Sequence, residues 1–153
     1  MTATTFRSDV VAAVRTVLLA RKAASPTLLR AVYNARPGSF PETPCAYIAG
    51  RNERITYTAQ TRARTMVGLE VVIVDTLSDA SETEDRMDDL VDLLVADFTT
   101  AKHGVAGGGG LLQLTSITDA DVTLTGDVAV TYRGAVLGFG DSANPTFIRE
   151  GTA

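Results

Sequence analysis

The sequence predicts a single α+β domain in which a mainly antiparallel sheet is packed by an N-terminal helix and a central acidic helix. Two segments carry apolar residues at the three- and four-residue spacing of helices that cover a core. Several shorter apolar segments, bounded by Pro, Gly and polar residues, have the pattern of strands. The 153 residues and 45% apolar content suit one domain with a packed core. This domain is expected to span residues 1–139, and residues 140–153 are expected to form a polar tail.

The N-terminal helix is expected to run from Asp9 to Ala24. Ser8 can cap its first turn, because a Ser hydroxyl accepts a hydrogen bond from a backbone N–H there. A second, shorter helix is expected to begin at Ser25-Pro26 and to end at Arg36-Pro37-Gly38. One face of the first helix carries the apolar residues Val10, Val11, Val14, Val17 and Leu18.

Three prolines then lead the chain into strands, since Pro favours extended backbone in the residue before it. The first strand is expected at Cys45–Ala49, and a second extended piece at Ile55–Thr58. The segment from Ala63 to Thr76 is the strongest strand candidate, because Leu69 and the run Val71–Val74 suggest burial on both faces. This segment is therefore expected to be a central strand.

The central helix begins with the pattern Ser81-Glu82-Thr83-Glu84, which is a capping box. A buried stripe and a polar face follow at helical spacing. The stripe consists of Met87, Leu90, Val91, Leu94 and Phe98, and the opposite face carries Asp85, Asp88, Asp89 and Asp92.

The last third of the chain begins with four glycines, Gly107–Gly110, which are expected to form a linker. Two segments with strand patterns follow, one from Leu112 to about Thr118 and one from Val128 to Phe139. They are expected to pair antiparallel, with a short strand at Val122–Leu124 between them. Phe147-Ile148 is an isolated apolar pair in the polar tail.

Charge is divided unevenly along the chain. Ten of the 14 Lys and Arg residues lie in the first 64 positions with only three acids, whereas the remainder holds 15 of the 18 acids. Such asymmetry concerns association, not fold. The arginines that bracket Ile55–Tyr57 make either a basic hairpin that faces a protein partner or a plain solvated hairpin. An acidic chain with few aromatic residues is not typical of a dedicated nucleic-acid reader. The bracketing arginines are Arg51, Arg54, Arg62 and Arg64.

The sequence offers little catalytic chemistry, and no enzyme activity or cofactor is expected. His103 is the only histidine and sits beside the glycine linker, while Cys45 follows Pro44 at the start of a strand, where a buried apolar role is commoner. The aspartates of the central helix could approach a divalent cation, yet no second carboxylate cluster completes such a site. A solvated or partner-facing helix surface is the better interpretation. Neither a secretory signal nor a membrane span is expected.

The order of elements resembles that of the tail terminator, or tail completion, proteins of long-tailed bacteriophages, the family typified by the lambda minor tail protein U. The resemblance covers roughly residues 8–139. It rests on that order and on three segments, Val32-Tyr33, Pro44-Cys45-Ala46-Tyr47-Ile48 and Gly68–Val74.

The resemblance implies an α+β subunit of the virion that is assembled in the host cytoplasm. It implies a ring, generally a hexamer, that caps the tail tube at its head-proximal end and joins the head–tail connector, with DNA passing through without specific binding. Complementary charge on two parts of one chain suits the interfaces of such a ring. The alternatives are another neck component, such as a stopper or head-closure protein, and a small cytosolic metal- or ligand-binding domain.

Overall fold

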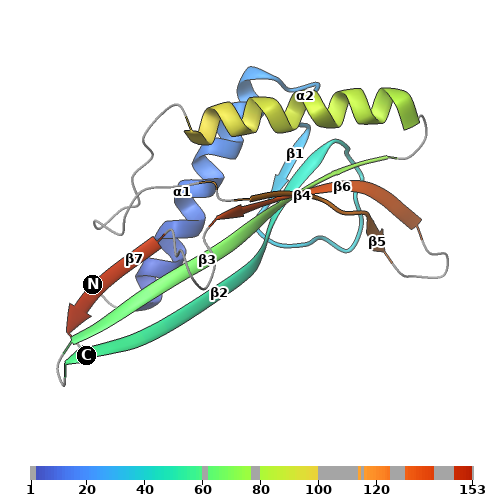
Figure 1. Ribbon diagram of the computed structural model, residues 1–153. Coiled ribbons are helices and arrows are strands. Elements are labelled where there is room, and N and C mark those ends of the chain that lie inside the picture. The colour runs from blue at the N-terminus through green and yellow to red at the C-terminus, as the bar shows by residue number, and fades with distance from the viewer. Residues whose placement is uncertain are drawn as a thin grey trace.

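In the computed structural model, the described residues are 3–59, 62–76, 80–99, 114, 116–124, 130–139 and 147–152. Within these ranges, only the backbone is described for residues 3–7, 50–68, 80–81 and 147–152; the other residues are described with their side chains. This part of the chain contains two helices, α1 (Ala3–Ala24) and α2 (Ala80–Thr99), and a mostly antiparallel sheet. Figure 1 shows the helices together on one side of the sheet. The predicted α+β fold is therefore confirmed.

The sheet has seven strands, and five of them lie in the order β1-β2-β3-β6-β4. β1 runs parallel to β2, and every other pair is antiparallel. Two short strands join beside this path, β5 on β6 and β7 on β3. The bounds are β1 Ala31–Tyr33, β2 Cys45–Ala59, β3 Arg62–Asp75, β4 Ser116–Asp119, β5 Val122–Leu124, β6 Val130–Phe139 and β7 Phe147–Thr152.

β3 is the central strand, as predicted, and its two halves have different neighbours. Residues Leu69–Asp75 pair with β6, whereas residues Arg62–Val67 pair with β7. β2 runs along both halves, with a bulge between Ala49 and Asn52. Figure 1 shows β2 and β3 side by side as a long hairpin that projects away from α2. We call the projecting part, residues 51–59 of β2, 62–68 of β3 and β7, the arm.

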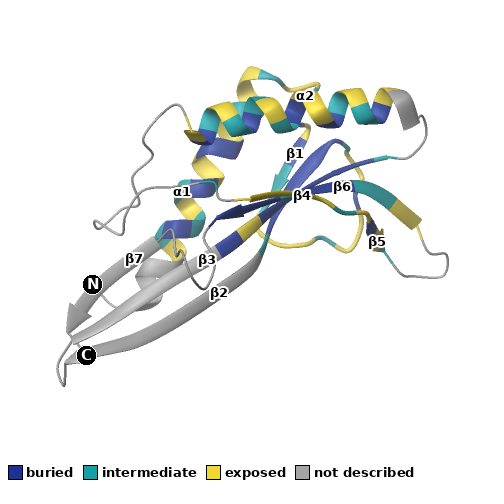
Figure 2. Cartoon of the chain, in the orientation of Figure 1, coloured by how far each residue is buried: buried dark blue, intermediate teal, exposed yellow. Residues whose placement is uncertain are grey.

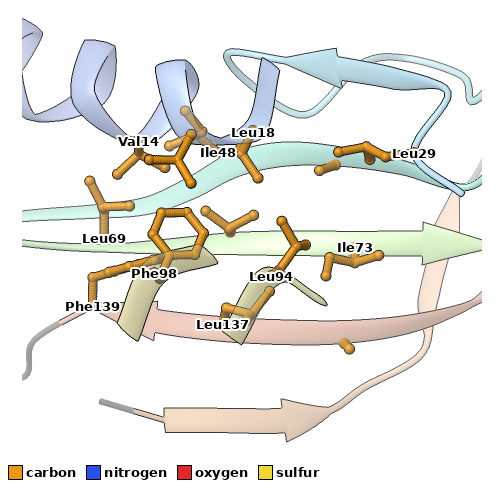
Figure 3. Packing of buried hydrophobic residues seen from close by; sticks show 14 of the residues in the cluster. Val14, Leu18, Leu29, Ile48, Leu69, Ile73, Leu94, Phe98, Leu137 and Phe139 are labelled. Carbon is orange, nitrogen blue, oxygen red and sulfur yellow. The ribbon is translucent and has the colours of Figure 1, made fainter. Parts of the chain in front are cut away.

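The main core lies between the helices and the sheet. Leu18 of α1, Leu94 of α2 and Ile73 of β3 are fully buried there. Figure 3 shows these side chains converging, with Phe98 of α2 over Phe139 of β6. The two rings meet edge to face, with centroids 4.8 Å apart and planes at 71°. This geometry is favourable for aromatic rings. The predicted stripe of α2 is confirmed, because Met87, Leu90, Leu94 and Phe98 are buried and Val91 packs beside them.

A smaller cluster covers the other face of the sheet. Phe40, from the segment between β1 and β2, is buried there against Tyr47 and Tyr132. Its ring stacks on Tyr47 at 5.9 Å between centroids and meets Tyr132 edge to face at 5.0 Å. Val71 and Ile73 belong to the main core, whereas Val72 and Val74 belong to this smaller cluster, so both faces of this stretch of β3 are buried. Figure 2 shows most of this stretch as buried. Burial on both faces explains the unbroken apolar run Val71–Val74.

The predicted second helix is wrong. After α1, the backbone N–H groups of Leu28 and Leu29 donate to the carbonyl of Ser25, and this single turn is not continued. The chain instead enters β1, whose residues Ala31–Tyr33 pair in parallel with Cys45–Tyr47. A β-branched residue at position 32 suits this pairing, which outweighs the helix-starting pattern. The helix α1 also begins earlier than predicted, at Ala3, so Ser8 lies inside it and is not its cap.

Three further expectations are corrected. Ile55–Thr58 is not a separate piece, because β2 continues through it from Cys45. Residues 147–152 do not lie outside the sheet as a tail, since they form β7 against the outer half of β3. Ser81 does not precede the central helix as its cap, because α2 begins one residue earlier, at Ala80.

The two closing strands are confirmed where the structure describes them, over Ser116–Asp119 and Val130–Phe139, although Leu114 lies outside any strand. β4 and β6 pair antiparallel, and the short strand at Val122–Leu124 forms β5 on the same partner. The predicted linker Gly107–Gly110 lies outside the described residues. Of the helices that the structure describes, neither is long and apolar enough to cross a membrane.

Candidate interaction surfaces

The acidic face of α2 is a charged surface without internal counter-charge. The helix carries seven acidic residues and one basic residue, Arg86. Five of the acids are exposed. Glu82 pairs with Arg86 within the helix, and the other four have no ion pair or hydrogen bond among the described residues. Carboxylates at this spacing on one helix repel each other. These four are Asp85, Asp88, Asp89 and Asp92, the residues predicted for this face, and we call them the acidic face.

Other acids of α2 are neutralised by arginines from the rest of the fold. Asp97 accepts two hydrogen bonds from Arg21 of α1, at 2.7 Å from Nε and 2.6 Å from Nη2. This two-pronged pair joins the two helices and raises the pKa of Arg21. The carboxylates that contact the body are thus paired, and those of the acidic face are not.

The start of α2 is fixed to the sheet by a second pair. Asp75, the last residue of β3, is 1% exposed and accepts hydrogen bonds from Arg86 at 2.9 and 3.1 Å. Its Oδ1 also accepts the backbone N–H of Thr76 at 2.7 Å. A buried carboxylate is costly without such partners. Thr83 adds a further bond, donating its hydroxyl to the carbonyl of Thr76 at 2.8 Å.

Arg133 of β6 lies at the centre of a group of three carboxylates. Its Nε donates to Glu84 of α2, its Nη2 lies 3.2 Å from Asp119 and its Nη1 lies 3.8 Å from Asp121. The hydrogen bond to Glu84 is the main cause of the raised pKa of Arg133. Because one guanidinium faces three carboxylates, a negative surplus remains at the turn between β4 and β5.

The predicted basic residues lie on the arm. Arg51 falls in the bulge of β2, whereas Arg54 is paired with Met66 across the hairpin. On β3, Arg62 and Arg64 stand opposite Thr152 and Glu150 of β7. The hairpin that these residues were predicted to flank is therefore present, while their side chains lie outside the described residues. Because the arm projects away from α2 in Figure 1, the fold does not bring the arginines and the acidic face together as one site.

The described residues give two observations on the candidate catalytic and metal-binding groups. Cys45 is buried, and desolvation raises the pKa of its thiol to about 12, so it is a core residue rather than a nucleophile. Within the described ranges, no three His, Cys, Asp or Glu side chains are grouped so as to hold a metal ion. His103 lies outside the described residues.

Sequence reasoning missed the three arginines that organise the acids, Arg21, Arg86 and Arg133. The partner of each is distant in the chain or on a neighbouring element. One signal was present, because Arg133 interrupts the apolar strand β6, and a charge in a sheet needs a partner. The identity of that partner depends on the packing of α2, which the spacing does not give.

Comparisons with known proteins identify no family for this chain. No family model matches it, and no curated protein matches it. A solved structure of a protein whose name states no function is similar, at 19% sequence identity and a TM-score of 0.43. The similarity covers 90% of this chain and 94% of the chain in that structure. A similarity at this level supports no conclusion about function.

Proposed function

We propose that this chain is a virion assembly protein that forms a ring capping the tail tube and joining it to the head connector, as a tail terminator does. It has no enzymatic role and no cofactor in this proposal. The observation that carries it is the acidic face of α2, which has four exposed carboxylates and no counter-charge among the described residues. A surface of this kind suits a partner that supplies positive charge.

Most of the element order that underlies the family resemblance is compatible with this proposal, although β1 stands where a short second helix was expected. A helix precedes the strand at Cys45, a long hairpin bearing arginines follows, and the acidic helix and two antiparallel strands complete the order. This agreement concerns the fold, and folds of one kind serve many functions. The charge distribution is what favours a role in association.

A ring needs two different surfaces on each subunit, because each copy meets the next head to tail. The arm and the body of this chain are such surfaces, since they differ in charge and lie apart in Figure 1. In the proposed ring, acidic residues that line the channel repel DNA phosphates and let the genome pass. Association between oppositely charged surfaces weakens as salt increases.

Electron microscopy of particles made without this protein tests the proposal. Loss of a terminator is expected to give overlong or uncapped tail tubes, and supplying the protein in trans is expected to restore their length. Tails of normal length that fail to retain DNA or to join heads would instead indicate a stopper or head-closure protein. Particles indistinguishable from those that contain the protein would overturn the proposal.

A further inference from the structure

β4 forms one open edge of the sheet. It is the last strand of the path β1-β2-β3-β6-β4, and no described strand pairs with its outer side. All four of its residues are exposed, and Ile117 is 48% exposed although it is a large apolar residue. An open edge presents unpaired backbone donors and acceptors to a further strand.

The arm has a second open edge, on β2. β1 pairs with β2 only over Cys45–Tyr47, so residues 48–59 have β3 on one side and no described strand on the other. The opposite side of the arm is closed, because β7 pairs with the outer half of β3. An edge of this length is rarely left without a partner or a protective device.

The two open edges differ in charge. Beside β4, Asp119 and Asp121 are 69% and 60% exposed and share Arg133 with Glu84, so negative charge is in surplus. The free part of β2 carries Arg51 and Arg54 with one acid, Glu53. The basic edge and the acidic edge are therefore complementary.

We infer that the arm of one copy pairs through the free edge of β2 with β4 of the next copy, so that the sheet continues across the subunit interface. The occupant of each edge is thus a second copy of this chain. The two edges lie at opposite ends of one sheet, so the contact is head to tail and can repeat around a ring. Hydrogen bonds between the edges supply affinity, as in other cases of strand addition. The ring itself rests on the function proposed above.

Cysteine cross-linking between copies tests this contact. One preparation carries Ile117→Cys, and the other carries Arg54→Cys, Ile55→Cys or Thr56→Cys, three consecutive positions that cover both faces of β2. Neighbouring strands bring Cα atoms within the distance that a disulfide spans. The native thiol does not interfere, because Cys45 is buried. The control replaces Ile117→Cys by Leu19→Cys, an exposed position on α1.

When the two preparations are mixed at low salt and oxidised, at least one pair with Ile117→Cys is expected to cross-link about tenfold faster than the control, because paired strands raise the effective concentration of the thiols. High salt is expected to reduce this advantage. Equal rates for all three pairs and the control, with each variant folded by circular dichroism, would overturn the inference. So would cross-linking of Ile117→Cys to purified tube protein in place of the arm.

A charge variant provides a second readout that does not depend on thiol geometry. Asp119→Lys is expected to abolish most of the association that light scattering measures at low salt, whereas Glu42→Lys, the same charge reversal at an exposed position between β1 and β2, is expected to retain it. Equal loss in both variants would contradict pairing at β4. Rings that cap tubes without the cross-link would reject this contact and leave the proposed function intact. Cross-linked copies that never cap tubes would support this contact and contradict the proposed function.

Discussion

The two halves of β3 differ in sequence, surroundings and role. The inner half, Leu69–Asp75, lies between the helices and the small aromatic cluster, and its apolar residues are buried. The outer half, Arg62–Gly68, lies in the arm between β2 and β7 and carries two arginines. One strand thus passes from a core to an extension of the sheet.

The difference teaches that stability and association are separable in this chain. Burial of apolar side chains stabilises the body, because each buried side chain contributes about 1.5–3 kcal/mol. The arm extends the sheet beyond these buried clusters and carries arginines, so we expect changes there to act mainly on association. Variants of the body should therefore alter unfolding, and variants of the arm should alter assembly.

The largest expected effect on stability is at Phe98. Phe98→Ala removes the ring that meets Phe139 in the main core and is expected to lower the free energy of unfolding by about 3–5 kcal/mol. Denaturant unfolding measures this change. Leu19→Ala, at an exposed position of α1, is the matched control and should cost less than about 0.5 kcal/mol. Similar costs for the two variants would contradict the assignment of the core.

The pair between Asp75 and Arg86 should rank second. Arg86→Ala leaves the buried carboxylate of Asp75 without its cation and is expected to cost about 2–3 kcal/mol, below the range for fully buried pairs because Arg86 is 32% exposed. Thermal unfolding compares this variant with Asp92→Asn, which removes a charge that has no partner in the described structure. A loss no greater than that of Asp92→Asn would show that the pair does not hold α2 to the sheet.

Two glycines of β6, Gly134 and Gly138, lie where neighbouring segments approach that strand closely. A Cβ at Gly134 would lie 2.2 Å from the backbone oxygen of Ala120, whereas a Cβ at Gly138 would meet only the Ser116 side chain closely. Because backbone cannot rotate away, Gly134→Ala is expected to cost about 1–3 kcal/mol. Gly138→Ala should cost less, since the Ser116 hydroxyl can turn. The reverse order in chemical denaturation would be inconsistent with this packing.

The smallest effect on stability is expected in the arm. Arg62→Glu combined with Arg64→Glu should change the free energy of unfolding by less than about 1 kcal/mol, the main cost being the like charges that it places opposite each other at positions 64 and 150. The same double variant should weaken association with copies or tubes, with a strong dependence on salt. Sedimentation at low and high salt measures the association of the double variant and of the unchanged protein. Normal assembly at low salt would mean that the arm is merely solvated.

Much of this fold follows from patterns that are local in the sequence. The run Val71–Val74 predicts the central strand because burial on both faces removes the alternation of polar residues. The spacing of Met87, Leu90 and Leu94 predicts α2, and the same spacing places the aspartates outside. These predictions succeed because the side-chain period of an element decides which residues are buried.

Other parts depend on contacts between distant segments, which no local pattern reports. The segment after Pro26 has a helix-starting sequence, yet Ala31–Tyr33 becomes a strand because β2 is there to pair with it. Phe147-Ile148 forms part of β7 only because the outer half of β3 offers an edge. The partners of Arg133 likewise follow from the register of β4 against β6.

The central claim is that this chain assembles into a ring that caps a tail tube. Size-exclusion chromatography with light scattering, at low salt and with purified tail tubes, tests it most directly. We expect a closed oligomer of this chain bound at the ends of tubes, and the double variant Arg62→Glu with Arg64→Glu should form less of it. A chain that remains a monomer and never binds tube ends would contradict the claim.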